Sequence, residues 1–310
     1  MYNVLVASKS FGYGAQNDDL LQLFSEHACS PEFSPLEEAD QRLTKFDGIV
    51  IGTEKVTRDL FKQTKRLKVI IKYGAGTDNI DKAAAQEYGV QVLNLPGINC
   101  ETVAEMALGL MFSVARRIVE GDRSIRNGTW KRLLGSPIRG KTLGVMGTGA
   151  IGRALIQMVA GLNMRILAYD LIHDEEIPKH GGEYVEFDDL LTQSDFVSLH
   201  LPLNEKTFHL IGSKELNFMK KEAFLINTSR GLVVDEEALY EALKNKKIAG
   251  AALDVFEVQP PFGSPLLGLD NVVCTPHIAA YTDETLRRMD AECVAILGWA
   301  LEKEGGRDSK

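Results

Sequence analysis

Short runs of apolar residues alternate with longer amphipathic stretches along nearly the whole chain. Most of these runs are continuously apolar, as expected for parallel strands that are covered on both faces. Strands that alternate with helices predict βαβ units and doubly wound sheets, so we expect an α/β fold. The predicted strands form two sets, first Asn3–Ala7, Gly48–Ile51, Lys68–Ile71 and Val90–Asn94, then Thr142–Met146, Arg165–Tyr169, Asp195–Leu199, Ala223–Ile226, Ile248–Leu253 and Asn271–Cys274.

One long amphipathic stretch, Glu101–Arg126, lies between the two sets and predicts a single helix. Its apolar residues recur at steps of three and four, which suits either a helix packed within one domain or a connector between two. A last helix is expected at about Asp283–Lys303, after Thr282, a residue typical of helix N-caps. If this helix folds back onto the first domain, that domain is discontinuous.

Length and charge narrow the class of protein. A chain of 310 residues is long enough for two domains. Its formal net charge of −8 repels nucleic acids and anionic lipids, so neither is expected as a partner. A transmembrane helix would need a run of about 18 apolar residues, and no such run and no basic leader at the N-terminus is present.

The cysteines favour a cytoplasmic protein with reduced thiols. Their spacing contains no CxxC pair and no metal-ligand pattern, so no metal site is expected. Cys274 follows two valines, and we expect it to be buried rather than reactive. The four cysteines are Cys29, Cys100, Cys274 and Cys293.

A glycine-rich motif follows the predicted strand Thr142–Met146. Gly147, Gly149 and Gly152 are spaced as G-x-G-x-x-G, and an apolar helical stretch comes next. This context is the one that a dinucleotide-binding loop requires. The glycines allow a tight turn, a close approach to a pyrophosphate and close helix–strand packing, and Ala150 and Ile151 open the helix whose N-terminus faces the phosphates.

Asp170 supports a preference for NAD. It ends the next predicted strand, 23 residues after Gly147, near the spacing expected for a carboxylate that binds the ribose hydroxyls. The six residues after it contain no Arg or Lys to bind a 2′-phosphate. NAD is therefore favoured over NADP.

Four polar residues come at or just after the carboxyl ends of strands in the second set. They are His200, Arg230, Asp254 and His277. Ligands of doubly wound sheets bind at this edge. Arg can hold a carboxylate with a planar fork of donors, His can exchange a proton with an alkoxide, and Asp254 could orient a nicotinamide. These groups suit a dehydrogenase that acts on a 2-oxo acid.

These residues and several longer stretches resemble the D-isomer-specific 2-hydroxyacid dehydrogenases, in particular the phosphoglycerate dehydrogenase-like branch. The resemblance runs from Gly48 through Tyr281. The matching stretches are residues 72–81, 99–105, 140–152, 199–207, 227–235, 252–256 and 275–278.

The resemblance implies a flavodoxin-like, discontinuous substrate domain at 1–98 and 281–310, and an inserted Rossmann domain at 99–280 that binds NAD. It also implies homodimers built on the NAD-binding domain, and a small 2-hydroxy or 2-oxo acid as substrate, with D-3-phosphoglycerate as one candidate. Arg230 is implied to anchor the substrate, and His277 to act as acid and base. Ala75, Gly76 and Asn99 are implied to bind the substrate carboxylate. The residues implied to line the cofactor are Pro202, Thr207, Thr228, Asp254 and His200. Lys9 and Lys72 are candidates to bind a distal phosphate.

One position departs from the family pattern. Similar enzymes have a Glu before the Pro that follows Asp-Val-Phe, and this Glu hydrogen-bonds the catalytic His; here the residue is Gln259. A Gln can orient the imidazole but cannot stabilise its protonated form by charge. We therefore place Gln259 in the catalytic set with His277 and Arg230.

Three interpretations of Gln259 remain open. His277 works over a narrower pH range, or Glu257 replaces the missing carboxylate. Alternatively the chemistry is that of formate dehydrogenases, which pair Gln with His and need no proton transfer. Or the substitution, natural or introduced, lowers activity, and a related alternative is an NAD-binding regulatory protein without catalysis.

Overall fold

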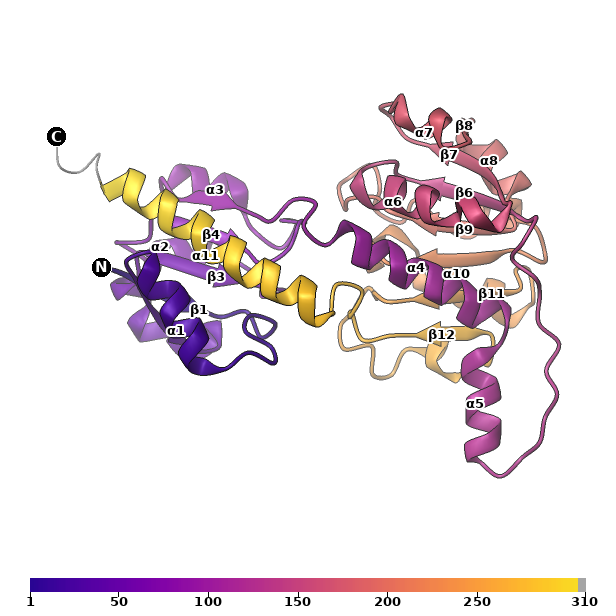
Figure 1. Cartoon of the computed structure of the whole chain (residues 1–310), viewed down its shortest axis with the longest axis horizontal. Helices are drawn as coiled ribbons and strands as arrows, with labels where there is room; N and C mark the ends of the chain where they lie inside the picture. Colours follow the sequence, from indigo (N-terminus) through magenta and orange to yellow (C-terminus); the bar gives the residue numbers. More distant parts are fainter. Residues whose placement is uncertain (306–310) are drawn as a thin grey trace. The chain divides into compact units, whose positions relative to one another are not determined.

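The structure is a computed structural model that describes residues 1–305, without the side chains of residues 40 and 41. The chain divides into two compact units, each with its own sheet (Figure 1). The first unit comprises Met1–Asn99 together with the segment from Tyr281 onward, and the second comprises Cys100–Ala280. None of the described helices is long and apolar enough to span a membrane.

The first unit contains a five-stranded parallel sheet with the order β2-β1-β3-β4-β5. This is the flavodoxin-like order of doubly wound folds. Its elements are β1 (Tyr2–Val6), α1 (Asn17–Glu26), β2 (Cys29–Phe33), the 3₁₀ helix η1 (Leu36–Lys45), β3 (Gly48–Ile51), α2 (Arg58–Gln63), β4 (Val69–Lys72), α3 (Lys82–Glu87), β5 (Gln91–Leu93) and α11 (Asp283–Gly305).

Successive residues of the central strands supply two separate cores. In β4, Val69 and Ile71 pack in the core that α1 and α11 cover, and Ile70 packs in the core on the other face with η1, α2 and α3. This division explains why the run is continuously apolar. Helix α11 supplies buried residues such as Leu286 and Leu297, so the C-terminal helix completes the core of the first unit.

The second unit contains a seven-stranded parallel sheet with the order β12-β11-β10-β9-β6-β7-β8. Within it, β8-β7-β6-β9-β10-β11 is the Rossmann order, with β12 added at one edge. Its strands are β6 (Thr142–Met146), β7 (Arg165–Tyr169), β8 (Gly182–Tyr184), β9 (Phe196–Leu199), β10 (Phe224–Asn227), β11 (Gly250–Leu253) and β12 (Val272–Cys274).

The helices of this unit cover both faces of the sheet (Figure 1). The α-helices are α4 (Cys100–Ala115), α5 (Ile118–Arg126), α6 (Ala150–Met158), α7 (Glu176–Lys179), α8 (Phe187–Gln193), α9 (Ser213–Phe218) and α10 (Glu236–Lys244). The 3₁₀ helices are η2 (Val159–Leu162), η3 (Gly231–Val233) and η4 (Pro265–Gly268). The predicted α/β class and the two doubly wound sheets are therefore confirmed.

The prediction of one helix over Glu101–Arg126 is wrong. The helix ends at Ala115, and α5 begins at Ile118 after Arg117, whose φ is +54°. The carbonyl of Ala115 accepts a hydrogen bond from Ser136 N (2.8 Å). Gly135 approaches so closely that a Cβ would lie 2.8 Å from the same carbonyl oxygen. The irregular segment that contains Gly135 and Ser136 thus occupies the space of the next helical turn.

The expectation that Cys274 is buried is also wrong, because it is exposed on the edge strand β12. Local burial of the thiol, together with nearby Glu236, raises the pKa of Cys274 to about 11. The thiolate is therefore scarce at neutral pH, which disfavours reaction of the thiol.

Candidate functional site

Four neighbouring strands of the second unit end in the polar residues singled out from the sequence. His200 follows β9, Thr228 and Arg230 follow β10, Asp254 follows β11, and His277 lies just beyond β12. The order β12-β11-β10-β9 places these ends side by side along the carboxyl edge of one sheet. The fold therefore brings together residues that are up to 77 positions apart in sequence.

His277 is held by Gln259. Its Nδ1 lies 2.8 Å from Gln259 Oε1, and Gln259 Nε2 donates a hydrogen bond to Phe256 O (3.2 Å). Because the amide nitrogen is used by the carbonyl of Phe256, the amide oxygen faces the ring, and Nδ1 must carry the hydrogen. Nε2 is then the atom that can accept or donate a proton in a reaction.

Asp254 builds the turn that presents His277. Its side chain is fully buried and accepts hydrogen bonds from Thr275 Oγ1 (2.6 Å), Ile278 N (2.9 Å) and Ala279 N (2.9 Å). Its carbonyl accepts one from His277 N (2.9 Å), and His277 itself has φ +56°. One carboxylate therefore fixes both sides of a turn in which a residue other than glycine adopts a left-handed conformation.

The Arg230 turn is packed against the segment that leads to Gln259. Asn227 Oδ1 accepts hydrogen bonds from Ser229 N (3.0 Å) and Ser229 Oγ (2.8 Å), and Asn227 Nδ2 donates a hydrogen bond to Arg230 O (2.9 Å). A Cβ on Gly231 would lie 1.9 Å from the carbonyl carbon of Phe256. Only glycine allows this backbone contact, so the turns that carry Arg230 and Gln259 form one rigid edge.

Glu257 points to other partners. Its Oε1 lies 2.9 Å from His209 Nε2 and accepts a hydrogen bond from Glu236 N (3.0 Å), and its own N–H donates to Glu236 Oε1 (2.6 Å). Burial and the charge of Glu257 raise the pKa of Glu236. With Asp235, which caps α10, Glu257 and His209 place ligand atoms within 4.8 Å of one another. We interpret this cluster as a brace for the loop that bears Gln259.

The glycine-rich loop joins β6 to α6 as predicted. Gly147 has φ +92°, and a Cβ there would lie 2.5 Å from His200 O. A Cβ on Gly152 would lie 2.0 Å from Gly147 O. Asp170 Oδ2 accepts from Thr148 N (2.7 Å) and Thr148 Oγ1 (3.1 Å), so the acidic residue also holds the loop.

Gly149 shows that the loop leaves room for a ligand. Its φ is −61°, which any residue can adopt, and no atom of the described residues lies within 4 Å of a Cβ built there. Neither the backbone nor the protein neighbours require glycine at this position. The need for glycine is explained by a group that approaches the backbone at the N-terminus of α6, as a pyrophosphate does.

Two buried polar atoms at the same edge are also suited to a cofactor. Thr228 Oγ1 and His200 Nδ1 have no hydrogen-bond partner among the described residues. His200 Nε2 lies 2.9 Å from Ser198 Oγ, and burial lowers the pKa of His200 to about 4, so the ring is neutral. Unpaired buried polar groups are costly, and a dinucleotide offers amide and hydroxyl groups that could pair with them. The residues present therefore fit NAD.

Pro202 and Thr207 form a turn after His200. Thr207 Oγ1 donates a hydrogen bond to Pro202 O (2.6 Å) and accepts a hydrogen bond from Asn204 N (2.9 Å). The hydroxyl that we expected to line the cofactor is thus already used to close this turn. The structure shows a shaping role for Thr207, while its contact with a cofactor stays a prediction.

Tyr184 is a residue of this site that the sequence analysis missed. Its hydroxyl lies 2.9 Å from Thr148 Oγ1 and accepts from Asp174 N (2.9 Å), and its ring stacks on His173 at 3.9 Å between centroids. It connects the glycine-rich loop to the segment after Asp170. A single tyrosine in the short strand β8 carries no sequence signal for this role.

The predicted substrate residues of the first unit follow β4 and β5. Gly74 has φ +135°, its carbonyl accepts from Leu95 N (2.9 Å), and Ala75 O accepts a hydrogen bond from Asn94 Nδ2. The carbonyls of this loop are thereby tied to the segment after β5. Ala75, Gly76 and Asn99 lie in this unit, whereas Arg230 and His277 lie in the other.

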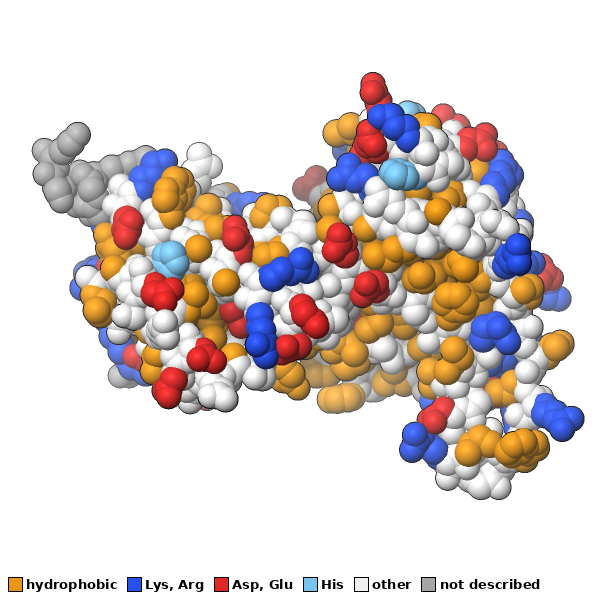
Figure 2. Space-filling model, in the orientation of Figure 1, with side chains coloured by type: hydrophobic (Ala, Val, Ile, Leu, Met, Phe, Trp, Pro, Cys, Tyr) orange, Lys and Arg blue, Asp and Glu red, His pale blue; other side chains and the backbone are white. Residues whose placement is uncertain are grey.

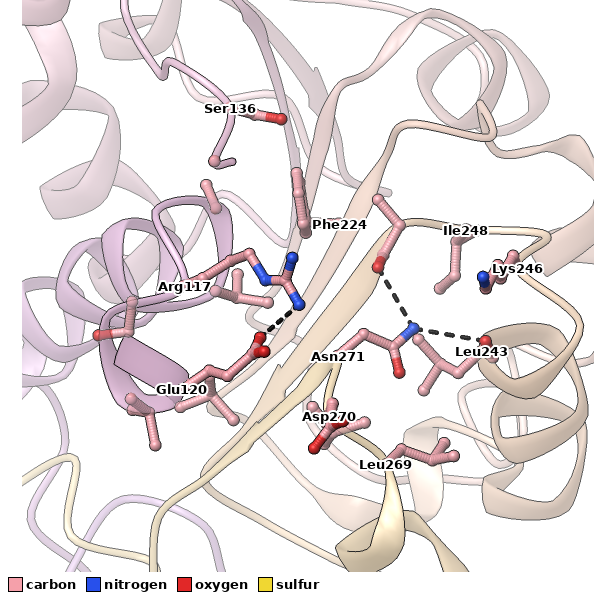
Figure 3. Close-up of a pocket in the computed structure, with 18 of the residues that line it drawn as sticks. Arg117, Glu120, Ser136, Phe224, Leu243, Lys246, Ile248, Leu269, Asp270 and Asn271 are labelled. Carbon is pink, nitrogen blue, oxygen red and sulfur yellow. Dashed lines mark hydrogen bonds and ion pairs between the residues drawn. The ribbon is translucent and has the colours of Figure 1, made fainter. Parts of the chain in front are cut away.

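A cavity of the second unit lies at the amino ends of its strands, opposite the edge that contains His277. It has a volume of about 680 Å³ and is lined by residues that begin or precede strands, such as Phe224, Ile248 and Asn271. Figure 3 shows Arg117 and Glu120 of the α5 region paired on one side, and the amide of Asn271 bonded to carbonyls on the other. This cavity is therefore not the site that contains His277.

Comparisons with known proteins place this chain in a family. The model of the family "D-isomer specific 2-hydroxyacid dehydrogenase, NAD binding domain" matches residues 108–279. The glyoxylate reductase of Korarchaeum cryptofilum is 47% identical over 264 residues, which are 82% of this chain and 79% of that protein. The D-3-phosphoglycerate dehydrogenase of Methanocaldococcus jannaschii is 44% identical over 254 residues, which are 80% of this chain but 48% of that protein.

Among solved structures, a D-lactate dehydrogenase of Aquifex aeolicus in complex with NAD and lactic acid has a TM-score of 0.85 at 28% identity, and the match covers 95% of this chain and 93% of that one. The fold and the glycine-rich loop define the second unit as an NAD-binding domain of an oxidoreductase. The chain belongs to the D-isomer-specific 2-hydroxyacid dehydrogenases. It is an enzyme that transfers a hydride between NAD and a D-2-hydroxy acid or 2-oxo acid.

Proposed function

We propose that this enzyme reduces small unbranched 2-oxo acids such as glyoxylate. The observation that carries the proposal is the pairing of His277 with Gln259, at the same sheet edge as Arg230, in a chain 47% identical to a glyoxylate reductase. Glyoxylate needs no pocket for a C3 substituent. The proposal replaces the narrower expectation of a phosphoglycerate dehydrogenase as the first candidate.

The chain's own residues would perform three tasks. Arg230, the amides of Ala75 and Gly76, and Asn99 would bind the carboxylate of the substrate. Arg230 would also draw electrons from the carbonyl oxygen. When the cofactor is bound, NADH would supply the hydride for reduction, and NAD⁺ would accept it for oxidation.

His277 would move the proton. In reduction, protonated His277 gives its Nε2 proton to the oxygen that becomes the hydroxyl, and in oxidation neutral Nε2 takes that proton back. Nδ1–H stays bonded to Gln259 Oε1 throughout. Gln259 thus fixes the reactive nitrogen without adding charge.

Assays with NADH and a panel of 2-oxo acids test this function. We expect NADH oxidation with glyoxylate, and a loss of kcat of about 100-fold or more in His277→Asn with NADH binding retained. Arg230→Lys should raise KM for glyoxylate, because the planar fork of donors is lost. If NADH binds but no acid in the panel is reduced, the alternative of a non-catalytic NAD-binding protein is favoured.

Lys72 supports D-3-phosphoglycerate as a second candidate substrate. It is a buried cation at the end of β4, with Nζ 3.5 Å from Tyr73 O, whereas Lys9 is exposed. A buried lysine suits a distal phosphate. Lys72→Met should raise KM for phosphoglycerate and leave KM for glyoxylate unchanged; no oxidation of phosphoglycerate by the wild type removes this candidate.

The α5 segment supports the proposal of a homodimer built on the NAD-binding domain. This helix contains no buried residue and extends away from the body of the second unit (Figure 1). Figure 2 shows apolar side chains gathered at this end. Ile118 and Ile125 of α5 are 52% and 55% exposed, and Trp130 and Leu134 of the segment after it are 81% and 92% exposed. Large apolar side chains that are exposed in one region are typical of interfaces. A second copy of this chain would cover them.

A further inference from the structure

Asp290 is a buried carboxylate that the proposed mechanism does not use. It lies in α11 and is 5% exposed. Its Oδ1 accepts hydrogen bonds from Tyr73 Oη (2.7 Å) and from Gly12 N (3.1 Å). Burial raises the pKa of Asp290, although both hydrogen bonds act in the opposite direction.

The surroundings of Asp290 are otherwise apolar. Leu286, Met289, Cys293 and Val294 are buried in the same core. A carboxylate loses its hydration in such a core, and two hydrogen bonds from neutral donors offset only part of that cost. The reason for an aspartate at this position must therefore be sought in the groups that it binds, Tyr73 Oη and Gly12 N.

The first partner leads to the substrate loop. Tyr73 is buried, its ring packs against Phe11 (5.4 Å between centroids), and it directly precedes Gly74, Ala75 and Gly76. The phenol therefore anchors the first residue of the loop whose amides we assign to the substrate carboxylate. Gly74 has a positive φ and no Cβ that would restrict its backbone. The direction of those amides therefore depends on where Tyr73 is held.

The second partner leads to the N-terminal loop between β1 and α1. Gly12 has φ +68°, and a Cβ there would lie 2.5 Å from a methyl carbon of Leu20. The same loop carries Lys9, and its Ser10 hydroxyl bonds the hydroxyl of Tyr281. One carboxylate thus connects this loop with the segment after β4 and with α11, all in the first unit.

We propose that Asp290 is a positioning residue that holds the Gly74–Gly76 amides and the Lys9 loop in the arrangement that binds a 2-oxo acid. The proposal rests on the proposed function, because Ala75 and Gly76 are taken as the carboxylate-binding residues. Asp290 acts through Tyr73 and Gly12 and does not touch the substrate. Its removal should therefore weaken substrate binding more than turnover or NADH binding.

The test compares Asp290→Leu, Asp290→Asn and wild type in the full chain. Leu suits the apolar core but cannot accept a hydrogen bond, whereas Asn keeps the acceptor. We expect Asp290→Leu to lower Tm, because Tyr73 Oη and Gly12 N lose a buried acceptor, and to raise KM for glyoxylate about tenfold, with kcat and the Kd for NADH within about twofold. Asp290→Asn should restore most of the wild-type KM.

Asp47 offers a matched control. It is also a buried carboxylate of the first unit, 3% exposed, but it precedes β3 and pairs with Arg66 (2.9 Å) and Asn3 N (2.9 Å) at the other edge of the sheet. Asp47→Asn should lower Tm and leave KM unchanged. An unchanged KM in Asp290→Leu, or an equal rise in KM in Asp290→Leu and Asp47→Asn, overturns the proposal.

Hydrogen exchange of the backbone amides separates this inference from the proposed function. Asp290→Leu should speed exchange at residues 74–76 and 10–13, and Asp47→Asn should not. If the wild type reduces no 2-oxo acid, the proposed function fails, but hydrogen exchange still decides whether Asp290 holds these loops. Equal exchange rates in wild type and Asp290→Leu would reject the positioning role of Asp290. Should Asp290→Leu not fold, Tyr73→Phe removes the 2.7 Å bond to Asp290 together with the 3.2 Å bond to Leu286 O and leaves the bond from Gly12 N in place, and the same two readouts apply.

Discussion

The side chain of Gln259 determines which nitrogen of His277 carries a proton in the neutral ring. Phe256 O fixes the amide, the amide oxygen accepts a hydrogen bond from Nδ1, and in the proposed mechanism Nε2 is the reactive atom. A glutamate at this position would fix the same tautomer. The difference between the two residues is therefore one of charge, and it appears only when His277 is protonated.

Gln259→Glu should move the pH profile of reduction. A carboxylate beside Nδ1 stabilises protonated His277, which is the acid needed for reduction, so the loss of activity at high pH should occur at a higher pH. For oxidation, which needs neutral His277, the loss at low pH should begin at a higher pH as well. The measurement is kcat/KM against pH in both directions.

Glu257→Gln is the control for that prediction. It removes a carboxylate two residues away that faces His209, so it should leave both limbs of the profile in place. A shift in Glu257→Gln together with none in Gln259→Glu would mean that Glu257 supplies the charge felt by His277.

His200 should make stability depend on pH. Its pKa is lowered from 6.5 to about 4 in the folded state because the ring is buried. As pH falls below 6.5, the unfolded chain binds a proton that the folded chain does not, so stability is lost between about pH 6.5 and pH 4 and is retained above that range. The free energy of unfolding that is lost over this range is at most about 3 kcal/mol.

Chemical denaturation of wild type and His200→Gln at several pH values checks this effect. The variant should lose less stability than wild type on acidification. His173→Gln, which changes an exposed ring stacked on Tyr184, should follow the wild-type curve. Parallel curves for wild type and His200→Gln would show that burial of His200 does not set this dependence.

At the scale of elements, strands were more predictable than helix ends. All ten predicted strands occur within two residues of their expected bounds, because continuously apolar runs identify strands buried on both faces. The edge strands β2 and β8 were missed, since Cys29–Phe33 contains Pro and Glu and Gly182–Tyr184 is very short. The break at Arg117 depends on a contact with Gly135 that no local pattern reveals.

The β6–α6 element allows a test that separates ligand binding from folding. Gly149→Ala should change the free energy of unfolding by less than about 0.5 kcal/mol, because no atom of the described residues lies within 4 Å of its Cβ. The same variant should weaken NADH binding about tenfold, because the added methyl group meets the pyrophosphate. Gly152→Ala should cost about 2 kcal/mol or more, because its Cβ would lie 2.0 Å from Gly147 O. Thermal unfolding and NADH titration measure both; full NADH affinity in Gly149→Ala would contradict the assigned approach of the pyrophosphate.

At the scale of the whole molecule, sequence reasoning placed the candidate site but not its supports. His277, Arg230 and Gln259 follow from motifs and from strand order. Tyr73 and Asp290 are 217 positions apart, and only the fold shows that they are bonded. Contacts of this kind combine common residue types at unrelated positions, so a single sequence gives no signal for them.

Assembly is the property that belongs to the whole molecule. We expect a homodimer in light scattering after size exclusion, and a shift toward monomer in Ile125→Asp and Trp130→Asp, since a charge on the exposed α5 segment disfavours burial. Trp299→Asp is the control, because Trp299 is 58% exposed but lies in the other unit. A wild type that is monomeric at all concentrations would contradict the proposal.

The division of the chain also has a consequence for the order in which the protein is synthesised. The second unit is one continuous segment, Cys100–Ala280, and all its strands precede α11 in the chain. The first unit cannot close its core until Leu286, Leu297 and Leu301 of α11 are available. The unit that is translated first therefore cannot finish folding until the second unit and α11 have been synthesised, so it cannot complete its fold ahead of the rest of the chain as N-terminal domains ordinarily do.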